Sequence, residues 1–155
     1  MTLSLISFGR EAGVVLSGLA AANDGDAPNV PALCLAVEAH LARLGLRAEQ
    51  LEILYDPATA VLRISGCAAN QDTRERIVLC CGNVRGVAAV DDCMTVLMPS
   101  EVSRWRFVQP GETLARIAHD LYRDPTREQH LRAANQPLLG DAEALEPGWL
   151  LRVPA

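Results

Sequence analysis

Cys80-Cys81-Gly82-Asn83-Val84-Arg85-Gly86-Val87 joins a predicted helix, residues 72–81, to a strand that we expect to start at Val87. Glycine often follows a helix in a left-handed conformation, so we expect Gly82 to end this helix in that way. The last carbonyl oxygens of a helix lack intrahelical partners and carry the negative end of its dipole. Two glycines allow such oxygens to converge on a weakly hydrated monovalent cation. The residues alone favour a simpler interpretation, a helix cap and a turn without a ligand.

The elements before and after this turn predict one sheet covered by helices, in an α+β fold. A helix over 31–44 carries a single apolar stripe, made of Leu33, Val37, Leu41 and Leu44. Two runs of β-forming residues flank a hairpin loop at residues 56–59, and we expect Gly66 to end the hairpin. In chain order the predicted elements are the helix over 31–44, strands over 51–55 and 60–65, the helix over 72–81 and a strand over 87–97.

The last of these strands contains the acidic pair Asp91-Asp92. Adjacent residues of a strand point to opposite faces of a sheet, so these two carboxylates cannot hold one divalent cation together. We expect both of them to be solvated at the start of the strand.

The first 22 residues are mostly apolar, and we expect them to dock onto the domain that follows. Apolar side chains between Leu3 and Leu19 recur near helical spacing, but glycines interrupt them, which predicts a broken helix. No positive charge precedes the apolar part and Arg10-Glu11 divides it, which argues against a signal peptide. No run of residues has the length of a membrane span.

The composition favours a small cytoplasmic protein that does not bind nucleic acid. The chain has 155 residues, 50% of them hydrophobic, and a net charge of −5, so it offers no basic surface for phosphates. Its five cysteines form no C-x-x-C pair and its three histidines complete no zinc spacing. Free thiols fit a reducing compartment. Since no nucleophile–base pair, paired carboxylates or phosphate loop stands out, we do not expect an enzyme.

The carboxy-terminal residues carry the most specific motifs in the chain. Arg106-Phe107-Val108-Gln109-Pro110-Gly111-Glu112-Thr113-Leu114 predicts a strand, a Pro-Gly turn and a threonine that caps a helix. A second helix is predicted over 127–135, and a turn and a closing strand follow over 147–154. This order, together with V-x-x-G-E-T-L, A-x-N and L-x-P-G-x-x-L-x-V-P in their expected places, resembles a LysM module.

LysM modules bind N-acetylglucosamine polymers through the loop after the first strand and the loop before the last. The resemblance therefore implies a glycan site at Gly111, Glu112, Thr113, Leu114 and, opposite them, Asn135. The alternative is that these residues only cap and pack the module. We favour that alternative for a chain without export, because such a chain would meet no peptidoglycan.

The segment before the LysM-like residues resembles a BON domain in its element order and in residues 82–92, which are similar to that family's glycine-centred turn into its last strand. A BON domain followed by one LysM module resembles a family of small cytoplasmic potassium-binding proteins of bacteria. Phe8-Gly9-Arg10-Glu11-Ala12-Gly13 is similar to that family's amino-terminal run, although Gly9 stands where the family has a larger apolar residue. The implied organisation is an amino-terminal segment over 1–22, an αββαβ BON domain over 23–98, a junction over 99–104 and a βααβ LysM module over 105–155.

In that family, main-chain carbonyl groups of the amino-terminal segment and of the glycine turn hold a potassium ion. The resemblance implies that the ligands in this chain are the carbonyl oxygens of Gly9, Ala12, Gly82, Val84 and Val87. A cage of neutral carbonyls can replace the hydration shell of potassium, and rubidium or caesium could stand in its place. Calcium or magnesium would require carboxylates, which the turn lacks.

The resemblance and the composition together predict a monomeric, cytoplasmic, non-enzymatic potassium-binding protein, acting as a sensor or buffer of the ion. Its LysM module could also contact a protein partner. The alternative is an envelope protein that binds peptidoglycan through the LysM module, and this alternative requires an exported chain.

Overall fold

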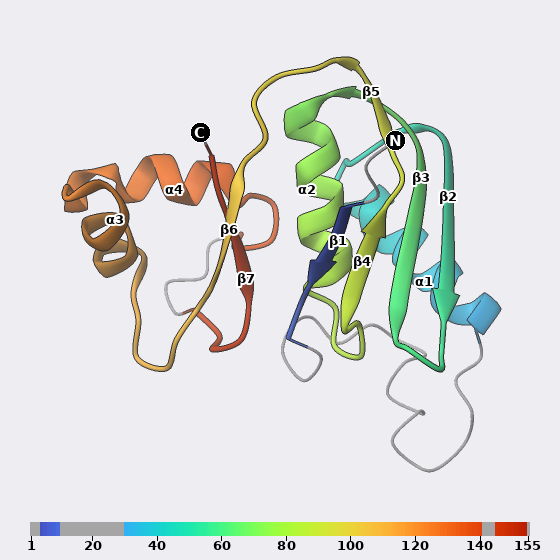
Figure 1. Ribbon diagram of the computed structural model, residues 1–155, viewed down its shortest axis with the longest axis horizontal. Coiled ribbons are helices and arrows are strands. Elements are labelled where there is room, and N and C mark those ends of the chain that lie inside the picture. Colours follow the sequence, from blue (N-terminus) through green and yellow to red (C-terminus); the bar gives the residue numbers. More distant parts are fainter. Residues whose placement is uncertain (1–3, 10–29, 141–144, 155) are drawn as a thin grey trace.

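The computed structural model describes residues 4–9, 30–140 and 145–154, which form an α+β fold with two separate sheets (Figure 1). The predicted fold class is therefore confirmed. We call the part with the five-stranded sheet the larger unit and the part with the two-stranded sheet the smaller unit. The larger unit consists of β1 (Ser4–Ser7), α1 (Val30–Arg43), β2 (Glu49–Asp56), β3 (Val61–Asn70), α2 (Gln71–Gly82), β4 (Ala89–Asp92) and β5 (Thr95–Met98). The smaller unit consists of β6 (Arg104–Phe107), α3 (Leu114–Tyr122), a short 3-10 helix (Pro125–Arg127), α4 (Glu128–Ala134) and β7 (Leu150–Val153).

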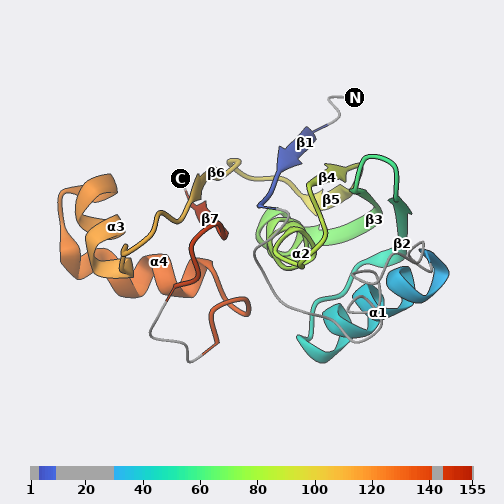
Figure 2. The same ribbon diagram turned by 90° about the horizontal axis from the view of Figure 1, so that it is seen from below.

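The larger sheet has the strand order β1-β4-β3-β2, and β5 pairs with the second half of β3. β3 is parallel to β4 and β5 and antiparallel to β2, while β1 is antiparallel to β4. Helices α1 and α2 lie on the same side of this sheet (Figure 2). Three members of the predicted stripe, Leu33, Val37 and Leu41, are buried in the core between helices and sheet, whereas Leu44 follows the end of α1 and is only partly buried.

The broken helix that we predicted from Leu3 is wrong for the residues that the structure describes at this end of the chain. Ser4–Ser7 is a strand, and its main chain pairs with β4 from Ser4 opposite Asp92 to Ser7 opposite Ala89. Leu5 and Ser7 are exposed while Ile6 packs against the core, which is the alternation of a strand. The remainder of the predicted helix, from Arg10 onward, lies outside the described residues.

Gly66 does not end the hairpin as predicted, because β3 continues past it to Asn70 and pairs with β5. Gly66 has a φ of +134°, and a Cβ there would lie 2.9 Å from the carbonyl oxygen of Glu49. The glycine thus permits a close approach where the register of β2 against β3 shifts. The single strand predicted over 87–97 is two strands, β4 and β5, which run one after the other beside β3.

Asp91 and Asp92 are not solvated as we expected. They are 8% and 7% exposed, because β4 lies inside the sheet between β1 and β3. The Nε–H of Arg63 donates to Asp91 and the Nε–H of Arg74 donates to Asp92, both at 2.9 Å. Arg63 belongs to the neighbouring strand and Arg74 to α2, so the two carboxylates are neutralised by partners from different elements.

The smaller unit follows the predicted order of strand, helix, helix and strand, with the 3-10 helix added before α4. Strands β6 and β7 are antiparallel. The hydroxyl of Thr113 accepts the N–H of Arg116 at 3.2 Å, so Thr113 caps α3 as predicted. A second core forms between the helices and β7, with Ile117, Leu131 and Leu151 at its centre.

Helix α2 lies between the larger sheet and β7 of the smaller unit (Figure 1). A buried ion pair joins α2 to β7. The Nε–H of Arg152 in β7 donates to Glu75 of α2 at 3.0 Å, and both side chains are buried. Glu75 also accepts the N–H of Ser103 at 2.9 Å, from the segment that links the units. A further arginine of α2, Arg76, donates to the carbonyl oxygen of Ala133 at 2.9 Å. Within the described ranges, no helix has the length and apolarity that a membrane crossing needs.

Candidate cation site

Helix α2 ends differently from the prediction. Gly82 is its last residue and Asn83 is its cap, with φ −83° and ψ 38°, so neither residue is left-handed. The reason for glycine is a close approach, because a Cβ at Gly82 would overlap the ring of Phe8. Gly82 therefore gives the amino-terminal segment a place to pack against the end of α2, and the prediction of a left-handed end was wrong.

The turn after α2, residues 83–87, is the glycine turn; it is tight and anchored in the core. The N–H of Val87 donates to the carbonyl oxygen of Val84 at 3.1 Å, and both valine side chains are buried. Between them Gly86 has a φ of +103°, a conformation that favours glycine. The hydroxyl of Tyr55 donates to the carbonyl oxygen of Gly86 at 3.2 Å, which ties the turn to the end of β2.

Phe8 holds the amino-terminal segment on this turn. Its N–H donates to the carbonyl oxygen of Ala88 at 2.8 Å, so the main-chain contact of β1 continues into the turn. Its ring fills the space beside Gly82 and meets the ring of Trp105 edge to face, with 6.3 Å between the centroids. Since Trp105 belongs to β6, Phe8 contacts both units.

Gly9, the residue after Phe8, lies against the smaller unit. A Cβ at Gly9 would lie 2.5 Å from the carbonyl oxygen of Gly148, which is too close for any larger residue in this conformation. Gly148 belongs to the turn before β7, and the neighbouring Glu146 lies 3.9 Å from the guanidinium of Arg85 in the glycine turn. The amino-terminal segment, the glycine turn and the turn before β7 thus meet at one place.

The structure accordingly brings together four of the five predicted ligand residues. Gly9 adjoins Phe8, which packs on Gly82, and Val84 and Val87 belong to the turn that Gly82 leads into. Ala12 lies outside the described residues. None of these residues has an oxygen in its side chain, so any ligand that they provide is a main-chain carbonyl. The Val84 carbonyl oxygen accepts one N–H and has a second lone pair.

Two buried thiols lie beside this turn and carry no charge at neutral pH. Burial raises the pKa of Cys80 to about 12, which outweighs the opposing effect of Arg76, and burial also raises the pKa of Cys81. In the part of the chain that the structure describes, no group of three or more His, Cys, Asp or Glu side chains could hold a metal ion. The thiols beside the turn are therefore neutral, and the charged side chains near it, Arg85 and Glu146, are 53% and 37% exposed.

Sequence reasoning missed the contacts of Asn83. Its side chain is 2% exposed and forms hydrogen bonds with Leu150, which is 67 residues away in the chain. An asparagine after a helix is an ordinary cap, and nothing near it in the sequence indicates a partner in the last strand.

The predicted glycan residues divide into exposed and buried members. Gly111 and Thr113 are exposed, while Leu114 is a core residue and Asn135 is 0% exposed. Glu112 accepts the guanidinium of Arg106 and the N–H of Gln109, both at 2.7 Å. Capping and packing therefore account for Glu112, Thr113, Leu114 and Asn135.

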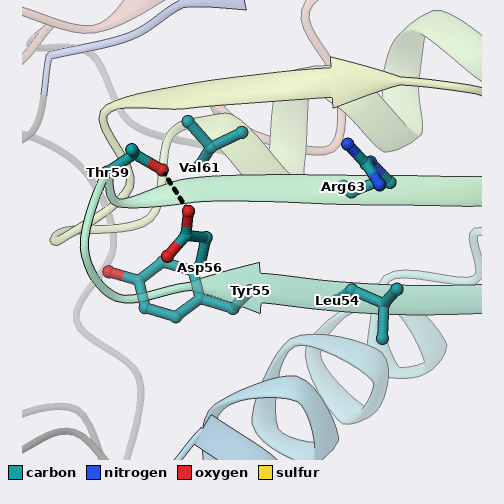
Figure 3. A pocket seen from close by; sticks show the side chains of 6 residues that line it. All are labelled: Leu54, Tyr55, Asp56, Thr59, Val61 and Arg63. Carbon is teal, nitrogen blue, oxygen red and sulfur yellow. Dashed lines mark hydrogen bonds between the residues drawn. The ribbon is translucent and has the colours of Figure 1, made fainter.

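A pocket of about 410 Å³ lies at the hairpin between β2 and β3 (Figure 3). Its carboxylate, Asp56, is used within the hairpin itself, because it accepts the Thr59 hydroxyl at 2.9 Å and the Ala58 N–H at 3.0 Å. Its lining residues are Leu54, Tyr55, Asp56, Thr59, Val61 and Arg63. We assign this pocket no ligand, and its relevance to the turn is the Tyr55 hydroxyl that reaches Gly86.

No family model matches the chain. The chain is similar to the potassium binding protein Kbp of Escherichia coli O6:H1 (strain CFT073), with 29% identity over 119 residues. The similar region covers 76% of this chain and 78% of that relative. The likeness thus extends over most of both proteins.

Proposed function

We propose that this chain is a non-enzymatic potassium-binding protein whose ion is held by main-chain carbonyl oxygens of the amino-terminal segment and the glycine turn. The proposed ligands are Gly9, Ala12, Gly82, Val84 and Val87. The observation that carries the proposal is the contact of Phe8 with this turn, through its ring on Gly82 and its N–H on Ala88. The likeness to a protein named for potassium binding supports the same ion.

The chemistry of the turn fits potassium better than a divalent cation. Potassium loses its water at a low cost, and neutral carbonyl oxygens can replace its hydration shell. Calcium and magnesium are bound mainly by carboxylates, and the proposed ligand residues have none. Rubidium and caesium share the weak hydration of potassium, so we expect them to occupy the same site.

We further propose that the larger unit is a BON-like domain and the smaller unit a LysM-like module, with the chain acting in the cytoplasm as a monomeric sensor or buffer of potassium. The helix–strand–strand–helix–strand order of α1 to β4 supports the first assignment, and the strand–helix–helix–strand order of the smaller unit supports the second. The free cysteines support a reducing compartment.

Thermal unfolding in a series of alkali chlorides at fixed ionic strength tests this proposal. An ion that binds only the folded chain stabilises it by RT ln(1 + [L]/Kd), about 2.7 kcal/mol at a hundred times Kd. The unfolding midpoint should therefore rise with the concentration of potassium, rubidium or caesium and change little with sodium. Identical midpoints in all four chlorides would contradict the proposal.

The second candidate function is binding of peptidoglycan by the smaller unit, which the exposure of Gly111 and Thr113 favours. Against it, the side chains of Leu114 and Asn135 are buried and cannot reach a glycan from solvent. Sedimentation with insoluble peptidoglycan distinguishes the two functions. We expect the chain to stay in the supernatant, and cosedimentation that free N-acetylglucosamine oligomers reverse would favour the second function.

A further inference from the structure

Two asparagines bind β7 with the same set of hydrogen bonds. Asn83 caps α2, and its side-chain N–H groups donate to the carbonyl oxygens of Leu79 and Leu150 while its side-chain oxygen accepts the Leu150 N–H, all at 2.9 Å. Asn135 caps α4, and its side-chain N–H groups donate to Leu131 and Arg152, both at 2.9 Å. Its side-chain oxygen accepts the Arg152 N–H at 2.6 Å. Each asparagine thus joins the end of its own helix to one residue of β7.

These bonds provide hydrogen-bond partners for the main-chain groups of β7 on the edge that faces away from β6. In an antiparallel pair, alternate residues of a strand direct their N–H and C=O groups to opposite edges. Leu150 and Arg152 are two residues apart, and both direct these groups to an asparagine. Because both asparagine side chains are buried, the amides replace water as partners of this edge. Aspartate lacks the donors for this role, so the amide is chemically required.

The two asparagines differ in what surrounds them. Asn83 stands between Gly82 and Val84, two of the proposed potassium ligands, whereas Asn135 ends a helix of the smaller unit. The N–H of Asn83 also donates to the Leu79 carbonyl oxygen at 3.2 Å, so both its main chain and its side chain are fixed. The hydrogen bonds of Asn83 therefore fix the position of the turn relative to Leu150, a residue of the other unit.

We infer that Asn83 is a positioning residue for the cation site, which it holds in its binding geometry by joining the glycine turn to Leu150 of the smaller unit. This inference rests on the proposed potassium function. It makes the affinity for potassium depend on the hydrogen bonds between Asn83 and Leu150, although Asn83 offers the ion no side-chain ligand. Asn135, with the same bonds on the same strand, has no such effect.

Other contacts keep the units docked when Asn83 is replaced. The ion pair between Arg152 and Glu75 lies on the same interface, as does the bond from Arg76 to the Ala133 carbonyl oxygen. Asn83→Ala therefore removes the connection between the turn and β7 without removing the interface. Asn135→Ala is the matched control, because it removes the equivalent three hydrogen bonds, two with Arg152 of β7 and one with Leu131 of its own helix.

The test measures potassium affinity and stability in sodium for the full-length chain and both variants. The apparent affinity is the intrinsic affinity multiplied by the fraction of molecules whose turn has the binding geometry. If this fraction is about a tenth, the apparent affinity for potassium is about tenfold lower. We expect both variants to unfold at lower temperature in sodium chloride, and only Asn83→Ala to bind potassium about tenfold more weakly. Equal potassium affinities of the two variants would overturn the inference. If the wild-type chain does not bind potassium, the proposed function is overturned as well.

Hydrogen exchange on the unaltered chain gives a second test, which stands even if a variant does not fold. The N–H of Leu150 reports the Asn83 bond and the N–H of Arg152 reports the Asn135 bond. Potassium should slow exchange at Leu150 more than at Arg152, compared with sodium at the same ionic strength. Equal slowing at both amides, with potassium bound, would show that Asn83 is not coupled to the site.

Discussion

The ring of Phe8 occupies the space that a Cβ of Gly82 would fill. This contact joins a strand at the start of the chain to the end of α2, 74 residues later, and it places the amino-terminal segment on the glycine turn. Neither residue has a side-chain oxygen that could bind a cation. Their effect is on shape, since the contact determines which main-chain groups face each other at the turn.

Gly82→Ala should therefore destabilise the chain and weaken potassium binding together. The added methyl forces the Phe8 ring away, and overpacking of this kind typically costs about 1–3 kcal/mol. Thermal unfolding in sodium and in potassium chloride would measure both effects. The double variant Phe8→Ala with Gly82→Ala is the control, because the methyl then meets no ring. If the clash is responsible, the two substitutions are not additive, and strict additivity would contradict this explanation.

Gly9→Ala tests the contact between the amino-terminal segment and the turn before β7. A Cβ there would lie 2.5 Å from the Gly148 carbonyl oxygen, so one of the two segments must move. We expect weaker potassium binding, measured by calorimetric titration. Gly45→Ala is the control, since its Cβ would meet nothing within 4 Å and only the strain of a φ of +75° remains. Potassium affinity that is unchanged in Gly9→Ala would argue against Gly9 as part of the site.

Asp72 should make the docking of the two units sensitive to acid. Partial burial raises the pKa of Asp72, but hydrogen bonds from Arg76 and Arg152 outweigh this and hold the pKa below its usual value. A lowered pKa in the folded state stabilises the chain above the pKa of the unfolded state, about 4, and this contribution is lost as the pH falls through the folded value. The difference in stability between the wild type and Asp72→Asn should therefore shrink toward acid pH in denaturant unfolding curves. A difference that stays constant from neutral to acid pH would contradict the assignment.

Cys80 should be unreactive in the folded chain. Burial raises its pKa to about 12, and the neighbouring Cys81 is also buried with a raised pKa, so neither thiolate is populated near neutral pH. Treatment with a thiol reagent at neutral pH, followed by peptide mass mapping, should modify these two residues only under unfolding conditions. Potassium should slow any remaining modification by stabilising the fold. Rapid modification of the native chain at either residue would show that the core beside the turn is open.

The sequence predicts the elements whose signals are local. The stripe from Leu33 to Leu41 marks the buried face of α1, and the Pro-Gly turn before Thr113 marks the start of α3. Both depend on residues within a few positions of each other, and both agree with the structure. The cap of α2 is local as well, since the side chain of Asn70 accepts the Thr73 N–H at 2.8 Å.

The features that the sequence does not predict depend on distant partners. Ser4–Ser7 is a strand because β4 is beside it, and four residues are too few to distinguish a strand from a helical turn by periodicity. The burial of Asp91 depends on Arg63 from the adjacent strand. Gly82 resembles an ordinary helix end until Phe8 is placed against it. Asn83 acquires its role only through Leu150, in the last strand of the chain.

The most direct test of main-chain ligation is to follow the carbonyl carbon resonances of the chain by NMR during a potassium titration at constant ionic strength, with sodium as the reference. The proposal predicts saturable shifts concentrated at Gly9, Ala12, Gly82, Val84 and Val87, with one dissociation constant for all of them. Saturable shifts that fall instead on carboxylate side chains, or carbonyl resonances of the glycine turn that are the same in potassium and sodium, would contradict it.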